Sequence, residues 1–202
     1  MLINRTHQRG VTLIELAVTF MVLGLLVVAA GPSIGEWIGN TQVRNTATSI
    51  YAGLNRARAE AVRSNRSVRF SLVSLTDSAV MDNSCALSAT GVSWVVSVNS
   101  PASLCATDPS DTVTPMIVDK VAGGVGGKRV VVSSKQSDGT AASTVTFNPF
   151  GRVTDSTAIS QIDIDNQVAG GDYRALRILV GSGGNVRLCD IKVTNSNDPR
   201  KC

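Results

Sequence analysis

Few residues of this 202-residue chain are of types that carry out catalysis or bind metals. His7 is its single histidine, and Ser-His-Asp triads, Cys-His pairs and most zinc sites need that side chain. Asp163 and Asp165 have no histidine, cysteine cluster or phosphate-binding loop near them in sequence, so we interpret them as charges at a strand edge. Residues 123–128 read Gly-Gly-Val-Gly-Gly-Lys, but an arginine follows the lysine, which breaks the phosphate-loop order and predicts a turn. These residues predict no enzyme, no metal site and no cofactor.

The four cysteines are Cys85, Cys105, Cys189 and Cys202. They contain no C-x-x-C spacing, which disfavours a metal site. In an oxidising compartment such thiols form disulfides, and four cysteines allow three connectivities. Proximity in the sequence favours Cys85–Cys105 and Cys189–Cys202.

One carboxylate, Glu15, lies near the start of a long apolar segment. Residues 11–30 contain only two other polar side chains, Thr12 and Thr19. Twenty helical residues at about 1.5 Å each span roughly 30 Å, the thickness of the hydrocarbon core of a bilayer. A carboxylate there costs about a few kcal/mol in lipid, so we expect Glu15 to have a partner.

Three general interpretations of this apolar segment stay open. One is a secretory signal peptide cleaved after the small residues 28–30, although the segment exceeds the usual apolar region of about 7–15 residues. A second is a plain membrane anchor oriented by Arg5, His7 and Arg9. The third is a helix buried in a protein core.

The helical pattern continues beyond the apolar segment. Proline inside a helix removes a hydrogen bond, so we expect a kink at Pro32. Apolar residues then recur at i, i+3 and i+4, which predicts an amphipathic helix over residues 32–65.

Six arginines between residues 44 and 69 accompany a single acid, Glu60. They form either a solvated helix face or a contact surface for neighbouring subunits. Arg56 has the i, i+4 spacing for an ion pair with Glu60.

Residues 66–202 predict a domain of short β-strands. Aromatic residues make up 4% of the chain, and turn sequences such as 137–139 and 148–151 separate the segments. A long helix followed by seven or eight strands predicts an α+β fold with two antiparallel sheets packed on the helix. The predicted strands cover residues 68–73, 92–98, 116–121, 129–133, 143–147, 158–164, 174–180 and 185–189.

The sequence Arg-Gly-Val-Thr-Leu-Ile-Glu-Leu over residues 9–16 resembles the class III signal of type IV pilins and type II secretion pseudopilins. The resemblance implies a leader over residues 1–10 and a transmembrane helix over residues 11–31. It implies that a prepilin peptidase cleaves between Gly10 and Val11 and methylates the new N-terminus. Glu15 would then pair with the mature amine of Val11 on an adjacent subunit, and Pro32 would mark where the helix loosens inside the filament.

Later motifs resemble the GspH/FimT/FimU group of minor pilins and pseudopilins. They are Ala-Arg-x-Glu-Ala at 57–61, Phe-x-Pro-x-Gly-Arg at 147–152, and Arg187-x-Cys189 followed by Cys202. The resemblance implies an assembly subunit whose tail is stapled by a disulfide. It also implies an inner-membrane protein with a periplasmic domain, whose partners are other pilins, prepilin peptidase and the inner-membrane assembly platform. Residues 76–115 match no motif of the group.

Three roles are compatible with this resemblance. The first is a minor pilin that primes or caps a type IV pilus, which the paired tail cysteines favour. The second is a type II secretion pseudopilin of the GspH type. The third is a FimT-like minor pilin that binds DNA for natural transformation.

The DNA hypothesis depends on local charge. Residues 174–202 contain six cations against two aspartates, enough to contact phosphates without reading sequence. DNA-binding members carry Gly-Arg-x-Arg, whereas residues 184–187 read Gly-Asn-Val-Arg. The candidate DNA contacts are Arg187, Lys192, Arg200 and Lys201.

Overall fold

The computed structural model describes residues 10–126, 129–168 and 173–202. The chain forms two compact units that divide after Trp37. Of the predicted leader, only Gly10 lies among the described residues.

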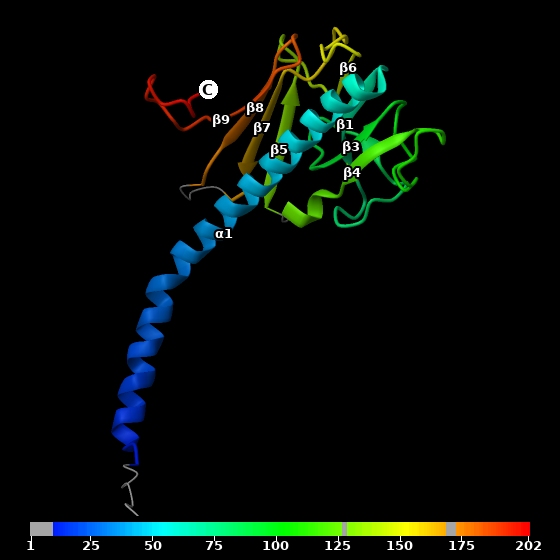
Figure 1. The fold of residues 1–202 in the computed structure, drawn as a ribbon. Helices are drawn as coiled ribbons and strands as arrows, with labels where there is room; N and C mark the ends of the chain where they lie inside the picture. Colours follow the sequence, from blue (N-terminus) through cyan, green and yellow to red (C-terminus); the bar gives the residue numbers. More distant parts are fainter. Residues whose placement is uncertain (1–9, 127–128, 169–172) are drawn as a thin grey trace, which may run out of the picture. The chain divides into compact units, whose positions relative to one another are not determined.

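Helix α1 covers Leu13–Ser64 and therefore belongs to both units (Figure 1). Thr12 caps its start, because the backbone N–H of Glu15 donates to Thr12 Oγ1 over 3.3 Å. The helix ends where Asn65 adopts a left-handed conformation with φ of 51°. This end agrees with the predicted boundary at residue 65.

Pro32 lies within α1, and the side chains of residues 29–33 are outside the description. The predicted kink at Pro32 and the predicted transmembrane span 11–31 stay predictions. Within the part of the chain that the structure describes, no helix is both long and apolar enough to cross a membrane.

The second unit contains two antiparallel sheets. In the first, β1 (Val68–Ser74) pairs along one edge with β3 (Ser93–Ser97), which in turn pairs with β4 (Ile117–Val121). The other edge of β1 is shared by β6 (Thr144–Phe147) and the two-residue β2 (Ala86–Leu87). The second sheet has the order β5 (Val130–Lys135), β7 (Gln161–Asn166), β8 (Leu176–Val180) and β9 (Val186–Asp190).

One hydrophobic core joins the second part of α1 to both sheets, which lie on its two sides in Figure 1. Burying each large aliphatic side chain stabilises the fold by about 1.5–3 kcal/mol. The predicted α+β fold with two antiparallel sheets is confirmed. Fully buried core residues include Ile50 and Leu54 of α1, Phe70 and Phe147 of the first sheet, and Ile162 and Ile178 of the second.

Several details differ from the predictions, and β5 and β8 have shifted bounds. Residues Gly123–Gly126 form a short 3-10 helix, η1, instead of a turn. Strand β7 begins three residues later than predicted, because Ile159 enters the core while its N–H bonds to Thr144 O outside the strand ladder. Strand β2 was not predicted, since two residues are too short to show an alternating pattern.

A second, smaller core explains where part of the unmatched segment 76–115 goes. The disulfide Cys85–Cys105 packs with Val73, Val95 and Ile117, which come from β1, β3 and β4. The segment therefore covers the first sheet and is stapled in place there.

Lys120 of β4 holds the loop that follows this disulfide. Its ammonium donates hydrogen bonds to the carbonyls of Cys105, Ala106 and Thr107 over 2.9, 3.0 and 2.8 Å. We expect Lys120→Met to lower the free energy of unfolding by roughly 2 kcal/mol, because three carbonyls lose a charged donor. Urea denaturation measures the change. The control is Lys135→Met, because Lys135 is exposed, and its expected loss of unfolding free energy is below about 0.5 kcal/mol. Equal losses in the two variants would contradict this role.

Candidate functional site

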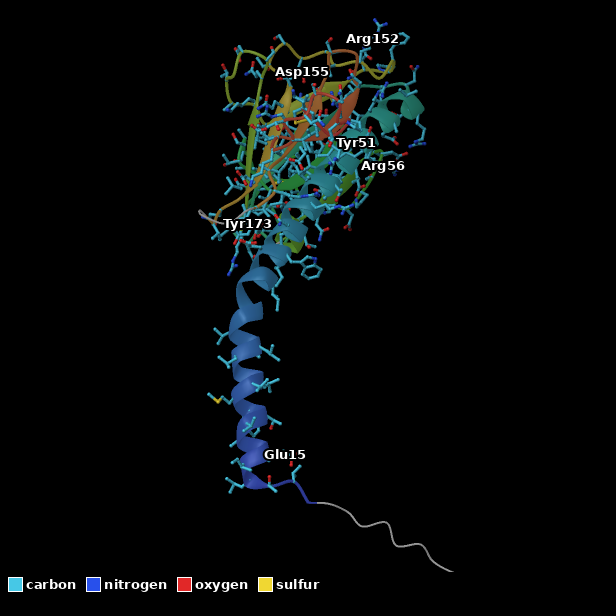
Figure 2. The ribbon with its side chains drawn as sticks, turned by 90° about the vertical axis from the view of Figure 1, so that its left-hand side faces the viewer. Glu15, Tyr51, Arg56, Arg152, Asp155 and Tyr173 are labelled. Atoms are coloured by element: carbon cyan, nitrogen blue, oxygen red, sulfur yellow. A yellow bond between two sulfur atoms is a disulfide. The ribbon has the colours of Figure 1, made fainter. Side chains whose placement is uncertain are left out.

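In the first unit, the apolar side chains of residues 11–28 are exposed. All the large apolar side chains from Val11 to Val28 are between 49% and 88% exposed, and Glu15 lies near the start of this segment (Figure 2). An exposed apolar surface of this length is typical of a site covered by protein or lipid.

Within this segment the polar groups differ in how they are satisfied. Thr19 Oγ1 donates to Leu16 O over 2.8 Å, so its hydroxyl is used by the helix itself. The backbone of Glu15 is bonded to Thr12, while no described residue donates a hydrogen bond to the Glu15 carboxylate. Thr12 was missed from the sequence, although Thr-x-x-Glu is the pattern of a capping box.

The arginines of α1 and the following strand serve different purposes. Glu60 pairs with Arg63 through two bonds of 2.8 and 2.7 Å, and the structure shows no direct ion pair between Glu60 and Arg56 among the described residues. Helical geometry permits both spacings, and the carboxylate turns toward the i+3 partner. Arg58 Nε donates to Gly151 O over 3.2 Å and ties the helix to the 148–152 turn.

The hydrogen bonds from Arg63 lower the pKa of Glu60 from its ordinary value of 4.5, against the opposing effect of burial. A carboxyl with a depressed pKa stabilises the fold above its unfolded pKa, and this stabilisation is lost as the pH falls through the folded value. We expect the free energy of unfolding to fall less steeply below pH 4.5 in Glu60→Gln than in the wild-type chain. Urea denaturation between pH 6 and pH 2 measures the difference, and parallel curves would contradict it.

Some cations of the basic C-terminal region already form ion pairs within the chain. Arg177 pairs with Asp163 over 2.6 Å, and Arg200 pairs with Asp198 over 2.7 Å. Arg200 lowers the pKa of Asp198 to about 2. Asp163 was missed as a counter-ion because it lies outside residues 174–202, although it faces Arg177 directly across β7 and β8.

Two candidate DNA contacts, Arg187 and Arg200, thus hold the tail itself. Arg187 Nη2 donates to Pro199 O over 3.4 Å and to Lys201 O over 2.5 Å. Lys201 forms a backbone bridge with Asp190, and Lys192 N donates to the carboxylate of the same aspartate. The structure thus gives the guanidinium groups of Arg187 and Arg200 intramolecular roles in the tail, whereas Lys192 and Lys201 contribute these contacts through their backbone.

A disulfide between Cys189 and Cys202 closes this tail, and the Cys85–Cys105 and Cys189–Cys202 pairs are those favoured by sequence proximity. The N–H of Asp190 also donates to Arg200 O over 2.7 Å, so the tail lies along the edge of β9. We expect the double variant Cys189→Ala/Cys202→Ala to lose roughly 3 kcal/mol of unfolding free energy, because its unfolded chain is less constrained. Urea denaturation with and without dithiothreitol checks this, and a change below about 0.5 kcal/mol would contradict it.

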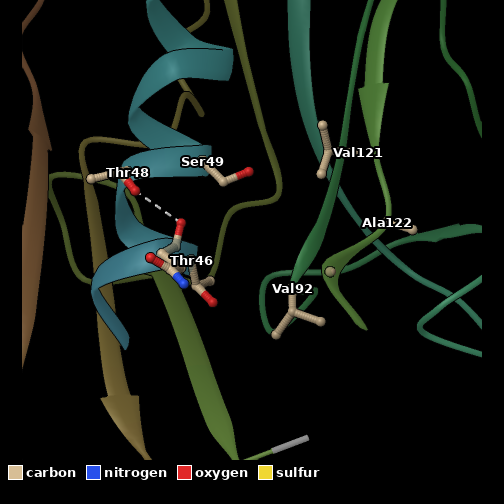
Figure 3. A pocket seen from close by; sticks show the side chains of 8 residues that line it. Thr46, Thr48, Ser49, Val92, Val121 and Ala122 are labelled. Atoms are coloured by element: carbon tan, nitrogen blue, oxygen red, sulfur yellow. Dashed lines mark hydrogen bonds between the residues drawn. The ribbon is translucent and has the colours of Figure 1, made fainter. Parts of the chain in front are cut away.

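A hollow of about 410 Å³ lies between α1 and the segments around β3 and β4 (Figure 3). Its described lining carries hydroxyl, amide and methyl groups and no titratable side chain. Thr48 Oγ1 is already bonded to the carbonyls of Arg44 and Asn45. The described lining therefore holds no titratable acid or base beside the hydroxyl groups of Thr46, Thr48 and Ser49.

The fold, the N-terminal segment and the stapled tail together define a pilin-like protein. Residues 5–31 match the prokaryotic N-terminal methylation motif, and residues 46–192 match the family of type II transport protein GspH. The chain belongs to the GspH family, and its predicted resemblance to the GspH/FimT/FimU group is confirmed. Pilin-like proteins with this motif are anchored in the membrane by the N-terminal helix and assemble with other pilins.

Two solved structures are similar to this chain. Both are of the type IV minor pilin FimU of Pseudomonas aeruginosa, in different crystal forms, with 16% sequence identity. Each alignment covers 72% of this chain. The first covers 90% of its FimU chain with a TM-score of 0.43, and the second covers 87% with a TM-score of 0.42. No curated protein matches the sequence.

Proposed function

We propose that this chain is a minor pilin that primes or caps the assembly of a type IV pilus. The observation that carries the proposal is the exposed apolar surface of residues 11–28, interrupted by one carboxylate at Glu15. A free subunit keeps this surface in the inner membrane, and an assembled subunit packs it against equivalent helices. It acts through assembly and not through catalysis.

Processing precedes assembly in this proposal. Gly10 and Val11 are exposed immediately before the helix begins, in a position that a prepilin peptidase can reach. Cleavage between them gives Val11 a new amine, which the enzyme methylates. The mature domain is periplasmic, and the inner-membrane platform extracts the subunit into the filament.

Filaments sheared from cells that lack the gene test this role, with a complemented strain as the control. Loss of surface pili that complementation restores is the expected result. Normal piliation in the deletion strain would contradict a priming role.

A second candidate is a pseudopilin of a type II secretion system. The description of the matching family as a type II transport protein favours it. Secretion of folded cargo by the same deletion strain separates the two roles, because a pseudopilin is required for secretion and a pilus subunit is not.

A further inference from the structure

A cleft rich in arginine lies where the end of α1 faces the loop before β4. It has a volume of about 340 Å³, and its lining includes Arg56 and Arg63 of α1, Arg66 just after the helix, and Ser110 and Asp111 of the loop. We call it the arginine cleft. It is large enough for a side chain of a docking protein.

Arg66 is poorly satisfied in this cleft. Its Nε is buried and has no hydrogen-bond partner among the described residues. Among the described residues, the bond of its Nη1 is to the sulfur of Met116 over 3.8 Å, and a thioether is a weak acceptor. A buried cationic donor without an acceptor destabilises the free chain, so an incoming oxyanion would relieve a cost already present.

The charges of the cleft match one added carboxylate. Its three arginines face two carboxylates, Glu60 and Asp111, which leaves an excess of one positive charge. Arg63 is held by Glu60, so Arg56 and Arg66 are the cations available to a ligand. A chain of phosphates would bring many negative charges close to Glu60 and Asp111, whereas one carboxylate balances the excess.

We propose that the arginine cleft receives one aspartate or glutamate side chain of a neighbouring pilin subunit. This inference rests on the proposed function, which supplies the neighbour. The planar guanidinium of Arg66 is suited to hold a carboxylate through two parallel hydrogen bonds. The contact orients the second unit of this subunit against the next one.

Stability and assembly should respond to Arg66→Met in different directions. The variant keeps much of the side-chain length and removes the unpartnered donor, so the melting temperature should stay unchanged or rise. Incorporation into sheared filaments should fall roughly tenfold, the loss expected for a charged hydrogen bond. Arg152→Met is the control, since Arg152 is exposed and lies beyond Arg56 at the end of the unit (Figure 2). A lower melting temperature, or incorporation equal to that of the control, would overturn the proposal.

A direct titration separates the cleft from the filament. The full-length chain in detergent micelles, labelled with ¹⁵N-arginine, is titrated with sodium acetate, sodium sulfate or sodium chloride at equal ionic strength. The Arg66 Nε–H resonance, identified by its loss in Arg66→Met, should shift and saturate with acetate at a lower concentration than with sulfate. No saturating shift, equal drift in all three salts, or a preference for sulfate would overturn the proposal. If wild-type filaments lack the subunit but acetate still saturates the resonance, the proposed function fails and the carboxylate site stands.

Discussion

Glu15→Ala should exclude the subunit from filaments while its cleavage continues. In the proposed filament, the mature amine of Val11 would lie in an apolar bundle of helices, where a charge is stable only beside an opposite charge. Removing one member of a buried ion pair costs roughly 3–5 kcal/mol, because the other charge stays buried and unpaired. Incorporation should therefore fall by about a hundredfold or more.

Immunoblots of sheared filaments and of membranes measure the two outcomes. Thr19→Ala is the matched control, because the Thr19 hydroxyl donates to the Leu16 carbonyl of its own helix. Normal incorporation of processed Glu15→Ala would show that the amine has no partner at this position.

Gly184→Ala should lower the free energy of unfolding of the domain more than a conservative substitution at the surface does. Gly184 has φ of +79°, and a Cβ atom there would lie 1.8 Å from Gly151 O. That oxygen cannot move freely, because it accepts the bond from Arg58 and belongs to the 148–152 turn. Left-handed strain and the clash together should lower the free energy of unfolding by roughly 3 kcal/mol.

The adjacent Gly183→Ala provides the control. A Cβ at Gly183 meets nothing closer than 3.9 Å, so its loss should be below about 0.5 kcal/mol. Urea denaturation measures the loss of unfolding free energy in both variants. Comparable losses in Gly184→Ala and Gly183→Ala would show that the turn can move away from β8 and β9.

Local patterns were sufficient to predict most of the fold. The i, i+3, i+4 periodicity of α1 depends on neighbours in sequence, and the helix and strand β1 were found where predicted. The side chains of β1 do not alternate between buried and exposed, since Ser71 and Val73 are buried as well as Phe70 and Leu72. Strand β2 could not be predicted, since its two residues are defined as a strand only by their pairing with β1.

The charged groups of the site depend on tertiary structure and were harder to predict. Both Arg56 and Arg63 lie within reach of Glu60 on a helix, and only the side-chain conformation selects Arg63. Asp163 neutralises Arg177 because of the register between β7 and β8. The unsatisfied Arg66 depends on Met116 and on the loop before β4, which are distant in sequence.

The shared core of the second unit has a mechanical consequence. Residues of α1 from Val43 to Ala61 pack into the same cluster as strands of both sheets. A pull along the helix axis is therefore transmitted to the two sheets in parallel, and neither can be peeled from the helix without disturbing the packing of the other. In a filament under tension, the load would be divided between both halves of the domain.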